Sequence, residues 1–349
     1  MKAVALREHG GPEVLKFDEI PAPPVGPGEV RVRVLACALN HLDIWVRKGI
    51  PTLRLNYPHI LGSDIAGEID AVGEGAGASS AGVKLERGAK VLVAPAVSCG
   101  RCDACSRGQD NLCRDYGILG EHRTGGYAEF ITVPARNILP YPESLSVEQA
   151  ASIPLVFMTA WQLAFEKAHV QAGETVLVMA AGSGVGTAAI QLCKLAGATV
   201  IAAAGSNAKL EKANQLGADF TINYQVKDYL DEVKRLTNRR GVDVVVDHTG
   251  AANWEKSLAC LCWGGRLATC GATSGFDAKM DLRHVFYRQL SILGSTMGSR
   301  GNLYKVISLF EQGKLIPVVD SVFPLERAGD AHRKMESRDL FGKLVLTVA

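Results

Sequence analysis

The sequence contains no run of eighteen apolar residues, so it offers no candidate for a transmembrane helix. It also lacks an excess of charge of one sign, because 38 Lys and Arg residues face 36 Asp and Glu residues, for a net charge of +2. This balance argues against nucleic acid or an anionic membrane surface as a partner. Low-complexity linkers and repeats of solenoid length are absent as well. We therefore expect the partners to be small molecules.

The first ten residues carry no apolar stretch followed by a small-residue cleavage site, so they are not a secretory signal. We expect a cytoplasmic protein. The chain has 349 residues, of which 47% are hydrophobic and 21% are charged. At about 150 residues per domain, this length predicts two globular domains with sizeable cores.

The first part of the chain has the pattern of an all-β domain. Short apolar runs separated by Gly and Pro predict strands at 30–36, 65–72, 90–94 and 128–133. The C-terminal part, with a helix expected near 303–311 and a strand near 344–348, is predicted to pack back on this domain.

After residue 150, apolar β-rich runs alternate with amphipathic helical runs. The predicted strands lie at 175–180, 199–204, 219–224, 242–247, 266–270 and 290–294. The predicted helices lie at 159–168, 185–195 and 208–216. This alternation indicates an α/β domain with a doubly wound parallel sheet, whose strands are apolar throughout because both faces are buried.

A turn rich in small residues follows the first strand of the alternating part and leads directly into a helix. Its residues are Ala181, Gly182, Ser183, Gly184, Val185 and Gly186. Small residues let the backbone approach a pyrophosphate, and the helix N-terminus offers unpaired N–H groups. The turn therefore predicts a dinucleotide site, although Ala181 and Ser183 stand where the strict fingerprint has glycine. The alternative is a tight turn without a ligand.

The end of the second strand distinguishes the two nicotinamide coenzymes. An NAD site places an acidic residue there to bind the ribose 2′-hydroxyl, whereas this chain has Ala204. Gly205, Ser206, Asn207 and Lys209 follow, and small and cationic groups suit a 2′-phosphate. We expect NADP(H) rather than NAD(H).

Four cysteines form the pattern C-x2-C-x2-C-x7-C in a polar loop: Cys99, Cys102, Cys105 and Cys113. Four thiolates around one ion make a closed zinc site, so the predicted role is structural. An iron–sulfur cluster is the alternative, but the bacterial pattern needs a shorter last spacing and a following Pro, where this chain has Arg114. The other cysteines lie in apolar surroundings and are expected to be core thiols: Cys37, Cys193, Cys260, Cys262 and Cys270.

Together these features resemble the medium-chain dehydrogenase/reductase family of zinc-type alcohol dehydrogenases and quinone reductases over essentially the whole chain. The specific pieces are Asn40-His41-Leu42-Asp43, Gly62-Ser63-Asp64-Ile65-Ala66-Gly67, the cysteine lobe, Gly125-Gly126-Tyr127-Ala128-Glu129-Phe130, and 181–186. The resemblance implies a GroES-like domain at 1–153 and 296–349, with a zinc lobe at about 95–115. It implies a Rossmann domain for NADP(H) at 154–295.

The chain departs from the alcohol dehydrogenase branch of this family at the ligands of the catalytic zinc ion. In that branch a Cys stands at the position of Asn40, and Gly-His-Glu stands where this chain has Gly62-Ser63-Asp64. The segment that supplies the third ligand falls here at 151–154, which offers no donor better than a serine hydroxyl. An open catalytic zinc site is therefore not expected. A substitute metal site from Cys37, His41, His59 and Asp64 is an alternative that nothing in the sequence supports.

The spacing of Asn40, Asp43 and Arg47 instead resembles the N-x-x-D-x-x-x-R stretch of zinc-independent quinone and enone reductases. In those relatives a Ser, a Lys and a Tyr hold the 2′-phosphate, and they correspond to Ser206, Lys209 and Tyr224. Further expected coenzyme contacts are Thr249, Gly271 and Gly294.

We therefore expect NADPH-dependent reduction of a quinone or an α,β-unsaturated carbonyl without a catalytic metal. Asn40 is expected to donate a hydrogen bond to the substrate oxygen, with Tyr57 or His41 as candidate proton sources. The candidate catalytic set is Asn40, His41, Asp43, Tyr57 and Asp64. One alternative is an alcohol dehydrogenase or aldehyde reductase, and another is an NADPH-binding structural or interaction protein without turnover. The resemblance also implies a homo-oligomer, with an edge strand near 290–294 available for pairing.

Overall fold

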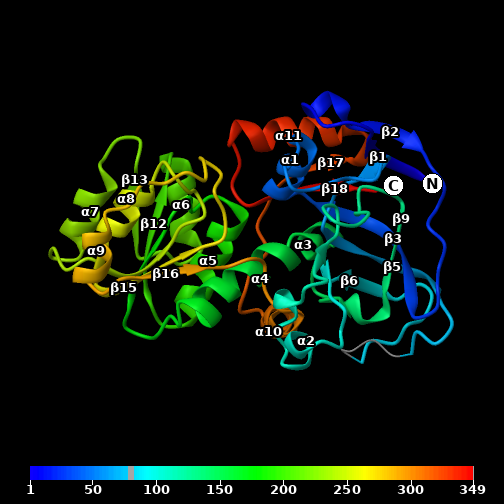
Figure 1. Ribbon diagram of the computed structural model, residues 1–349, viewed down its shortest axis with the longest axis horizontal. Coiled ribbons are helices and arrows are strands. Elements are labelled where there is room, and N and C mark those ends of the chain that lie inside the picture. The colour runs from blue at the N-terminus through cyan, green and yellow to red at the C-terminus, as the bar shows by residue number, and fades with distance from the viewer. Residues whose placement is uncertain (78–81, 349) are drawn as a thin grey trace. The chain divides into compact units, whose positions relative to one another are not determined.

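In the computed structural model, which describes residues 1–77 and 82–348, the chain divides into two compact units. The first unit comprises Met1–Leu155 and Ser299–Ala349, and the second comprises Val156–Gly298. The chain therefore completes the second unit before it returns to the first, so the blue and red ends of the ribbon belong to one unit (Figure 1).

The first unit is built around a seven-stranded sheet in the order β10-β6-β5-β3-β18-β17, with β9 also paired with β3. Its strands are β3 (Glu29–Ala38), β5 (Asp64–Val72), β6 (Lys90–Val93), β9 (Phe130–Pro134), β10 (Ile138–Pro140), β17 (Val319–Pro324) and β18 (Lys343–Thr347). Val30, Val32 and Val34 of β3 are buried, whereas Arg31 and Arg33 alternate with them and form ion pairs with acidic residues of β5. Strand β18 pairs antiparallel with β3, which brings the C-terminal segment beside the loop that follows β3.

Two small sheets and several helices complete this unit. The small sheets contain β1 (Lys2–Leu6), β2 (Lys16–Glu19) and β4 (His59–Ile60) in one, and β7 (Ala96–Val97) and β8 (Gly117–Ile118) in the other. The helices are α1 (His41–Lys48), α2 (Asp103–Ser106), α3 (Val147–Ala151), α10 (Arg300–Glu311) and α11 (Ala328–Ser337), with short 3₁₀ turns at η1 (Pro12–Val14), η2 (Asp110–Leu112), η3 (Ala135–Asn137) and η5 (Leu325–Arg327). Helix α4 (Pro154–Trp161) begins in this unit and continues into the second.

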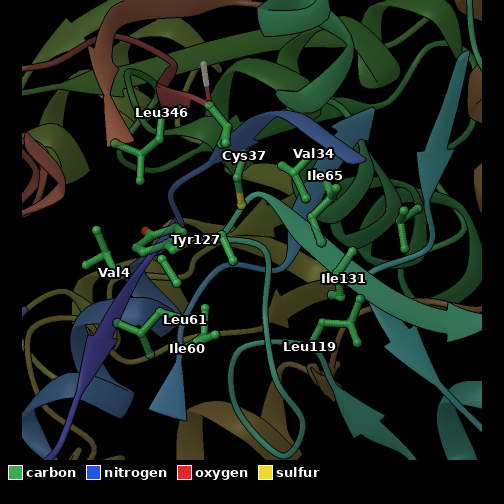
Figure 2. Packing of buried hydrophobic residues seen from close by; sticks show 14 of the residues in the cluster. Val4, Val34, Cys37, Ile60, Leu61, Ile65, Leu119, Tyr127, Ile131 and Leu346 are labelled. Carbon is green, nitrogen blue, oxygen red and sulfur yellow. The ribbon is translucent and has the colours of Figure 1, made fainter. Parts of the chain in front are cut away.

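The core of the first unit is filled by side chains from strands and loops that are distant in the sequence (Figure 2). The turn at Gly62 enters this core with a φ of 99°. A Cβ at Gly62 would lie 2.5 Å from Cδ1 of Tyr127 and 2.7 Å from Sγ of Cys37, both of which are fully buried. Only glycine fits there, because both the backbone angle and the packing exclude a side chain.

The second unit is a six-stranded parallel sheet in the order β13-β12-β11-β14-β15-β16. Its strands are β11 (Thr175–Val178), β12 (Thr199–Ala204), β13 (Phe220–Asn223), β14 (Val242–Val246), β15 (Leu261–Thr269) and β16 (Ser291–Gly294). Its helices are α5 (Gly184–Leu195), α6 (Asn207–Gln215), α7 (Tyr229–Leu236), α8 (Trp254–Ala259) and α9 (Leu282–Tyr287). Counted within the unit, the strand order is 3-2-1-4-5-6, with the switch point between β11 and β14. The predicted doubly wound α/β fold is confirmed.

Two predicted elements differ in detail. The helix expected at 159–168 is α4 up to Trp161 and then a π-helical segment, η4 (Gln162–Lys167), because the hydrogen bonds shift by one residue, as from the Ala168 N–H to the Leu163 carbonyl. Strand β15 begins at Leu261 rather than near residue 266, since an exposed Trp263 and two glycines interrupt its apolar pattern. Within 1–77 and 82–348, no helix is both long and apolar enough to cross a bilayer.

A buried ion network fixes α1 against α11 in the first unit. Arg47 has no exposed surface, and its Nη2 donates to Oε1 of Glu336 at 2.7 Å. Its Nη1 lies 3.3 Å from Nδ1 of His332, whose Nε2 lies 3.3 Å from the Tyr127 hydroxyl. Because a guanidinium can only donate, Nδ1 of His332 is the acceptor and Nε2 carries the proton. The network holds the C-terminal end of α1 against α11.

This network predicts an acid-sensitive stability. Burial, and secondarily the Arg47 charge, lower the pKa of His332 from 6.5 to about 3. A lowered pKa means that the unfolded chain binds the proton first, so the stability due to neutral His332 is complete above about pH 6.5 and is lost as the pH falls toward 3. The loss is about 1.4 kcal/mol per pH unit within that window.

His332→Gln keeps an acceptor for Arg47 and a donor for Tyr127 but does not titrate, so its free energy of unfolding should depend less steeply on pH between about 6.5 and 4. Denaturant titrations at several pH values measure this difference. His169→Gln, at an exposed position, is the control that should keep the wild-type slope. Equal slopes for His332→Gln and wild type would contradict the prediction.

Candidate active site

Asn40 lies between the end of β3 and the start of α1, at the N-cap of that helix. The carboxylate of Asp43, at the third position of α1, joins this helix start to the glycine turn. Its Oδ2 accepts from the Asn40 backbone N–H at 2.7 Å, and its Oδ1 accepts from the Gly62 N–H at 3.0 Å. Asp43 therefore fixes the position of Asn40 by the same reciprocal pattern that a capping box uses.

Asp43 is 1% exposed, and burial raises its pKa to about 6 against the opposing effect of its two backbone hydrogen bonds. Both carboxylate oxygens already bind backbone N–H groups. The sequence grouped Asp43 with the candidate catalytic residues, and the structure places it as a buried anchor behind Asn40.

The side chain of Asn40 belongs to a second buried cluster with Asp64 and Lys343. Asn40 Nδ2 donates to Asp64 Oδ2 at 2.9 Å. The Nζ of Lys343 lies 2.6 Å from Asn40 Oδ1 and 2.9 Å from Asp64 Oδ2. All three side chains are nearly inaccessible, at 5%, 0% and 3% exposed respectively. A third contact, from the Leu155 N–H to Asp64 Oδ1 at 2.7 Å, completes the hydrogen bonding of the carboxylate.

Sequence reasoning did not identify Lys343. The signal for it was present, because Lys343 is a lone cation at the start of the otherwise apolar run Leu344–Leu346. A lysine that begins a buried strand needs a buried acidic or polar partner. Its partners come from elements about 280 and 300 residues away, and only the folded chain shows which they are.

The two candidate proton donors have different surroundings. His41 is the first residue of α1, is half-buried, and packs edge-on against Trp45 with ring centroids 5.2 Å apart. Tyr57 is 43% exposed and contacts the ring of His9 at 6.0 Å. The described contacts do not select one of them as the proton source.

The donor set around Asn40 does not fit a catalytic zinc ion. Asn40 offers an amide, Ser63 is fully buried with its hydroxyl donated to the Leu119 carbonyl at 2.7 Å, and Asp64 is paired with an ammonium group. His59 bonds the Gly120 carbonyl at 3.0 Å, and burial lowers its pKa. In the described ranges, no metal-ligand group includes Cys37, His41, His59 or Asp64.

Cys99, Cys102, Cys105 and Cys113 do converge, with their sulfur atoms within 4.8 Å of one another. They come from the loop after β7, from α2 and from the end of η2. The Cys102 N–H points at the Cys99 sulfur at 3.3 Å, and the Cys99 N–H points at the Cys113 sulfur at 3.4 Å. Backbone N–H groups lower the pKa of Cys99 to about 6, which favours the thiolate. The predicted tetrahedral thiolate site is geometrically available.

In the second unit, the predicted dinucleotide site lies at the turn from β11 into α5. Ser183 is the N-cap of α5, and its Oγ accepts from the Gly186 N–H at 3.0 Å. A Cβ at Gly186 would lie 2.5 Å from the Ala180 carbonyl oxygen, so only glycine allows the helix to approach the strand this closely. The remaining turn residues, Ala181, Gly182, Gly184 and Val185, complete the path into the helix, whose N-terminal N–H groups can face an anion.

His248 is a residue of this site that the sequence did not reveal. It follows β14 across the switch point, and its Nε2 lies 2.8 Å from Ser183 Oγ. Burial lowers the pKa of His248 and so favours the neutral ring. Its Nδ1 has no partner in the described part of the chain. Thr249, the next residue, bonds the buried carboxylate of Asp247 through both its N–H and its hydroxyl.

The residues expected at a 2′-phosphate follow the carboxyl ends of the adjacent strands β12 and β13. Ser206 caps α6, with its Oγ accepting from the Lys209 N–H at 3.4 Å. A Cβ at Gly205 would lie 3.3 Å from the Tyr224 ring, so the glycine keeps that ring close. Tyr224 also lines a hollow of about 790 Å³ at this end of the sheet.

The last two expected coenzyme contacts lie at strand ends. Gly271 follows β15, and a Cβ there would lie 3.0 Å from the His248 carbonyl oxygen. Gly294 is the last residue of β16, and a Cβ there would meet no described atom within 4 Å. Packing within the unit therefore explains glycine at the first position and not at the second.

Comparisons with known proteins agree with this architecture. Residues 26–143 match the family model of the alcohol dehydrogenase GroES-like domain, and residues 184–312 match that of zinc-binding dehydrogenase. The chain is similar to a solved structure described as an NAD-dependent alcohol dehydrogenase, with 53% identity, a TM-score of 0.96 and coverage of 100% of both chains.

Two curated relatives represent both branches of the expected family. One is an NAD-dependent alcohol dehydrogenase of Sulfurisphaera tokodaii, 32% identical over 99% of both chains. The other is a quinone oxidoreductase of Homo sapiens, 29% identical over 99% of this chain and 97% of that protein. The similarity thus extends over both units.

Proposed function

Since the chain belongs to the medium-chain dehydrogenase/reductase superfamily, we propose that it is an oxidoreductase that transfers a hydride from NADPH to a quinone or an α,β-unsaturated carbonyl without a catalytic metal. One observation carries the proposal: the cluster of Asn40, Asp64 and Lys343 presents an amide and an internal ion pair, where a catalytic zinc would need free ligands.

The proposed reaction needs little from the protein beyond position and a hydrogen-bond donor. Bound NADPH supplies the hydride, which adds to the electrophilic carbon while the C=C or quinone π electrons move onto the carbonyl oxygen. Asn40 Nδ2 has two N–H groups, of which one binds Asp64 and the other can donate to that oxygen. A proton from water, or from His41 or Tyr57, then completes the product. We assign the reactant-facing role to Asn40, and positioning roles to Asp43 and Asp64.

A substrate panel tests this assignment. Asn40→Ala should lower kcat/KM for enones and quinones about 100-fold, the usual cost of losing one donor to a developing oxyanion, and should leave the Kd of NADPH unchanged. Coupled absorbance assays and coenzyme titrations measure the two quantities. Unchanged turnover of every enone and quinone would remove Asn40 from the reaction. Coenzyme binding by wild type with no turnover of any carbonyl would favour a non-enzymatic binding role.

Alcohol oxidation is a second candidate, favoured by the 53% identity to a structure described as an NAD-dependent alcohol dehydrogenase. That reaction normally uses a Lewis acid to stabilise the alkoxide from which hydride leaves. Oxidation of a primary alcohol that is blocked by a chelator would support it over the enone and quinone reaction.

NADPH is supported as coenzyme by the residues at the end of β12. Ala204 replaces the acidic group that would repel a 2′-phosphate, and Ser206, Lys209 and Tyr224 follow the ends of β12 and its neighbour β13. The names of two of the similar proteins point instead to NAD. Direct measurement of both affinities decides between the two coenzymes.

Lys209→Ala should weaken NADPH binding about tenfold or more, because a charge-assisted hydrogen bond contributes about 1.5–3 kcal/mol, and should leave NADH binding unchanged. Fluorescence titration of each reduced coenzyme measures this. Lys212→Ala, which removes an exposed lysine of the same helix, is the matched control. Wild-type protein that binds NADH as tightly as NADPH would contradict the assignment.

We also propose that the four converging cysteines hold one structural Zn²⁺ ion. Four thiolates in tetrahedral reach satisfy zinc completely and leave no position for substrate. The ion would tie α2 and the loops around it together, in a lobe with little apolar core of its own.

Elemental analysis of protein purified without added metal should give about one zinc per chain and no iron. Cys105→Ser should lower the zinc content and the thermal midpoint, whereas Cys270→Ser, outside the cluster, should retain the metal. Two zinc ions per chain would contradict the metal-free site around Asn40 and support the alcohol dehydrogenase alternative.

A homo-oligomer is a further proposal. Strand β16 ends the sheet order of the second unit, and no other strand of the described ranges pairs with its outer edge. Exposed apolar side chains occur in the same unit, among them Trp263 and Phe286 at 62% and 69% exposed. Edges and apolar patches of this kind favour self-association.

The cytoplasmic location expected from the sequence stays a prediction.

A further inference from the structure

The ammonium group of Lys343 is unusual because it is buried rather than extended to solvent. Only 3% of the residue is exposed, although lysine normally carries its charge to the surface. Taking an ammonium and a carboxylate out of water costs several kcal/mol per ion, which the 2.9 Å contact with Asp64 must offset. A buried ion pair of this kind is expected where its charge takes part in the function of the site or where the pair fixes the local geometry.

The cluster fixes the orientation of the Asn40 amide without ambiguity. An ammonium group only donates, so the Asn40 atom 2.6 Å from Lys343 is the amide oxygen. An ionised carboxylate only accepts, so the atom 2.9 Å from Asp64 Oδ2 is the amide nitrogen. Lys343 and Asp64 thus clamp both ends of the amide, and one N–H of Asn40 is left with a defined direction.

The ammonium group also balances the negative charge of the site. Asp64 from β5 is ion-paired with Lys343. Asp43 from α1 and the thiol of Cys37 in β3 are buried near enough for the Lys343 charge to act on them, since it lowers the pKa of both against the effect of burial. Without the lysine, the nearest charge to Asn40 would be an unpaired carboxylate. A carboxylate there would repel the negative charge that forms on a reduced carbonyl oxygen.

We propose that Lys343 is a positioning residue that takes the place of a metal ion, supplying a fixed positive charge beside Asn40 and holding the second N–H of the Asn40 amide toward the substrate oxygen. The inference rests on the proposed function for the identity of the substrate. It adds that the ammonium group of a lysine in strand β18 supplies the positive charge that an exchangeable metal ion would otherwise supply.

Chemical rescue tests the charge. Lys343→Ala removes three methylene groups and the ammonium group, which are together the atoms of n-propylammonium. We expect kcat to fall about 100-fold and the Kd of NADPH to stay unchanged. Saturating n-propylammonium should restore kcat about tenfold or more, whereas n-propanol, of the same size but neutral, should not. Lys343→Arg should retain more activity than Lys343→Ala.

Two outcomes of this assay would overturn the proposal. One is wild-type kcat in Lys343→Ala, and the other is rescue by n-propanol equal to that by n-propylammonium, which would show a filled cavity and not a restored charge. Lys334→Ala is the matched control, since it breaks a lysine ion pair with Asp320 elsewhere in the same unit. It should show neither loss of kcat nor rescue.

A second measurement needs neither coenzyme nor substrate. Lys343→Met and Asp64→Asn each leave one buried group without its partner, so each should lower the thermal midpoint of the coenzyme-free protein. The double variant removes both charges and should recover most of the loss. A double variant that loses the sum of the two single effects would show that the pair is not coupled and would overturn the proposal.

The two proposals can fail separately. If wild-type protein oxidises an alcohol but reduces no enone or quinone, the proposed function is wrong. The same Lys343 variants and amine rescue, assayed on the alcohol, then still decide whether the ammonium group positions Asn40. If the wild-type protein turns over no substrate, the thermal midpoints of Lys343→Met, Asp64→Asn and the double variant decide whether Lys343 and Asp64 are coupled.

Discussion

The carboxylate of Asp64 joins four segments of the first unit that are far apart in the sequence. It accepts hydrogen bonds from the side chain of Asn40 before α1, from Lys343 at the start of β18, and from the backbone of Leu155 at the start of α4, while its own strand β5 pairs with β3. A buried carboxylate without these partners would be costly. Asp64 thus orients the side chain of Asn40, whose backbone is held by Asp43.

The same interaction decides what chemistry the site can perform. A zinc ion needs ligand atoms with free lone pairs. The carboxylate oxygens of Asp64 already accept hydrogen bonds from an amide, an ammonium group and a backbone N–H. The residues around Asn40 therefore do not offer the ligands that zinc would need, although residues 184–312 match the family model of zinc-binding dehydrogenase. The four cysteines that converge elsewhere in the first unit form the separate cluster for which a structural zinc ion is proposed.

In the second unit, the residues predicted to bind a coenzyme lie at and after the carboxyl ends of the parallel strands. Parallel strands direct their carboxyl ends to one edge, and at the switch point between β11 and β14 this edge brings Ser183 and His248 to 2.8 Å from each other. Tyr224 lies beside Ala204 and Gly205 because β12 and β13 are adjacent and in register. The residues predicted to contact a coenzyme therefore lie at strand ends, in the turns that follow them and in the first turns of α5 and α6.

The sequence by itself determined the doubly wound sheet, the glycine-rich turn and the spacing of the four cysteines, because these depend on local periodicity and on residues close along the chain. It also proposed Asn40, His41, Asp43, Tyr57 and Asp64 as a catalytic set, of which Asn40, Asp43 and Asp64 are joined by hydrogen bonds. Only the tertiary structure decided that Asp43 is a buried anchor, that Lys343 completes the cluster, and that His248 faces Ser183. Each of these depends on contacts across about 20 to 300 residues, and a buried polar residue shows in the sequence that it needs a partner but not which partner the fold will bring to it.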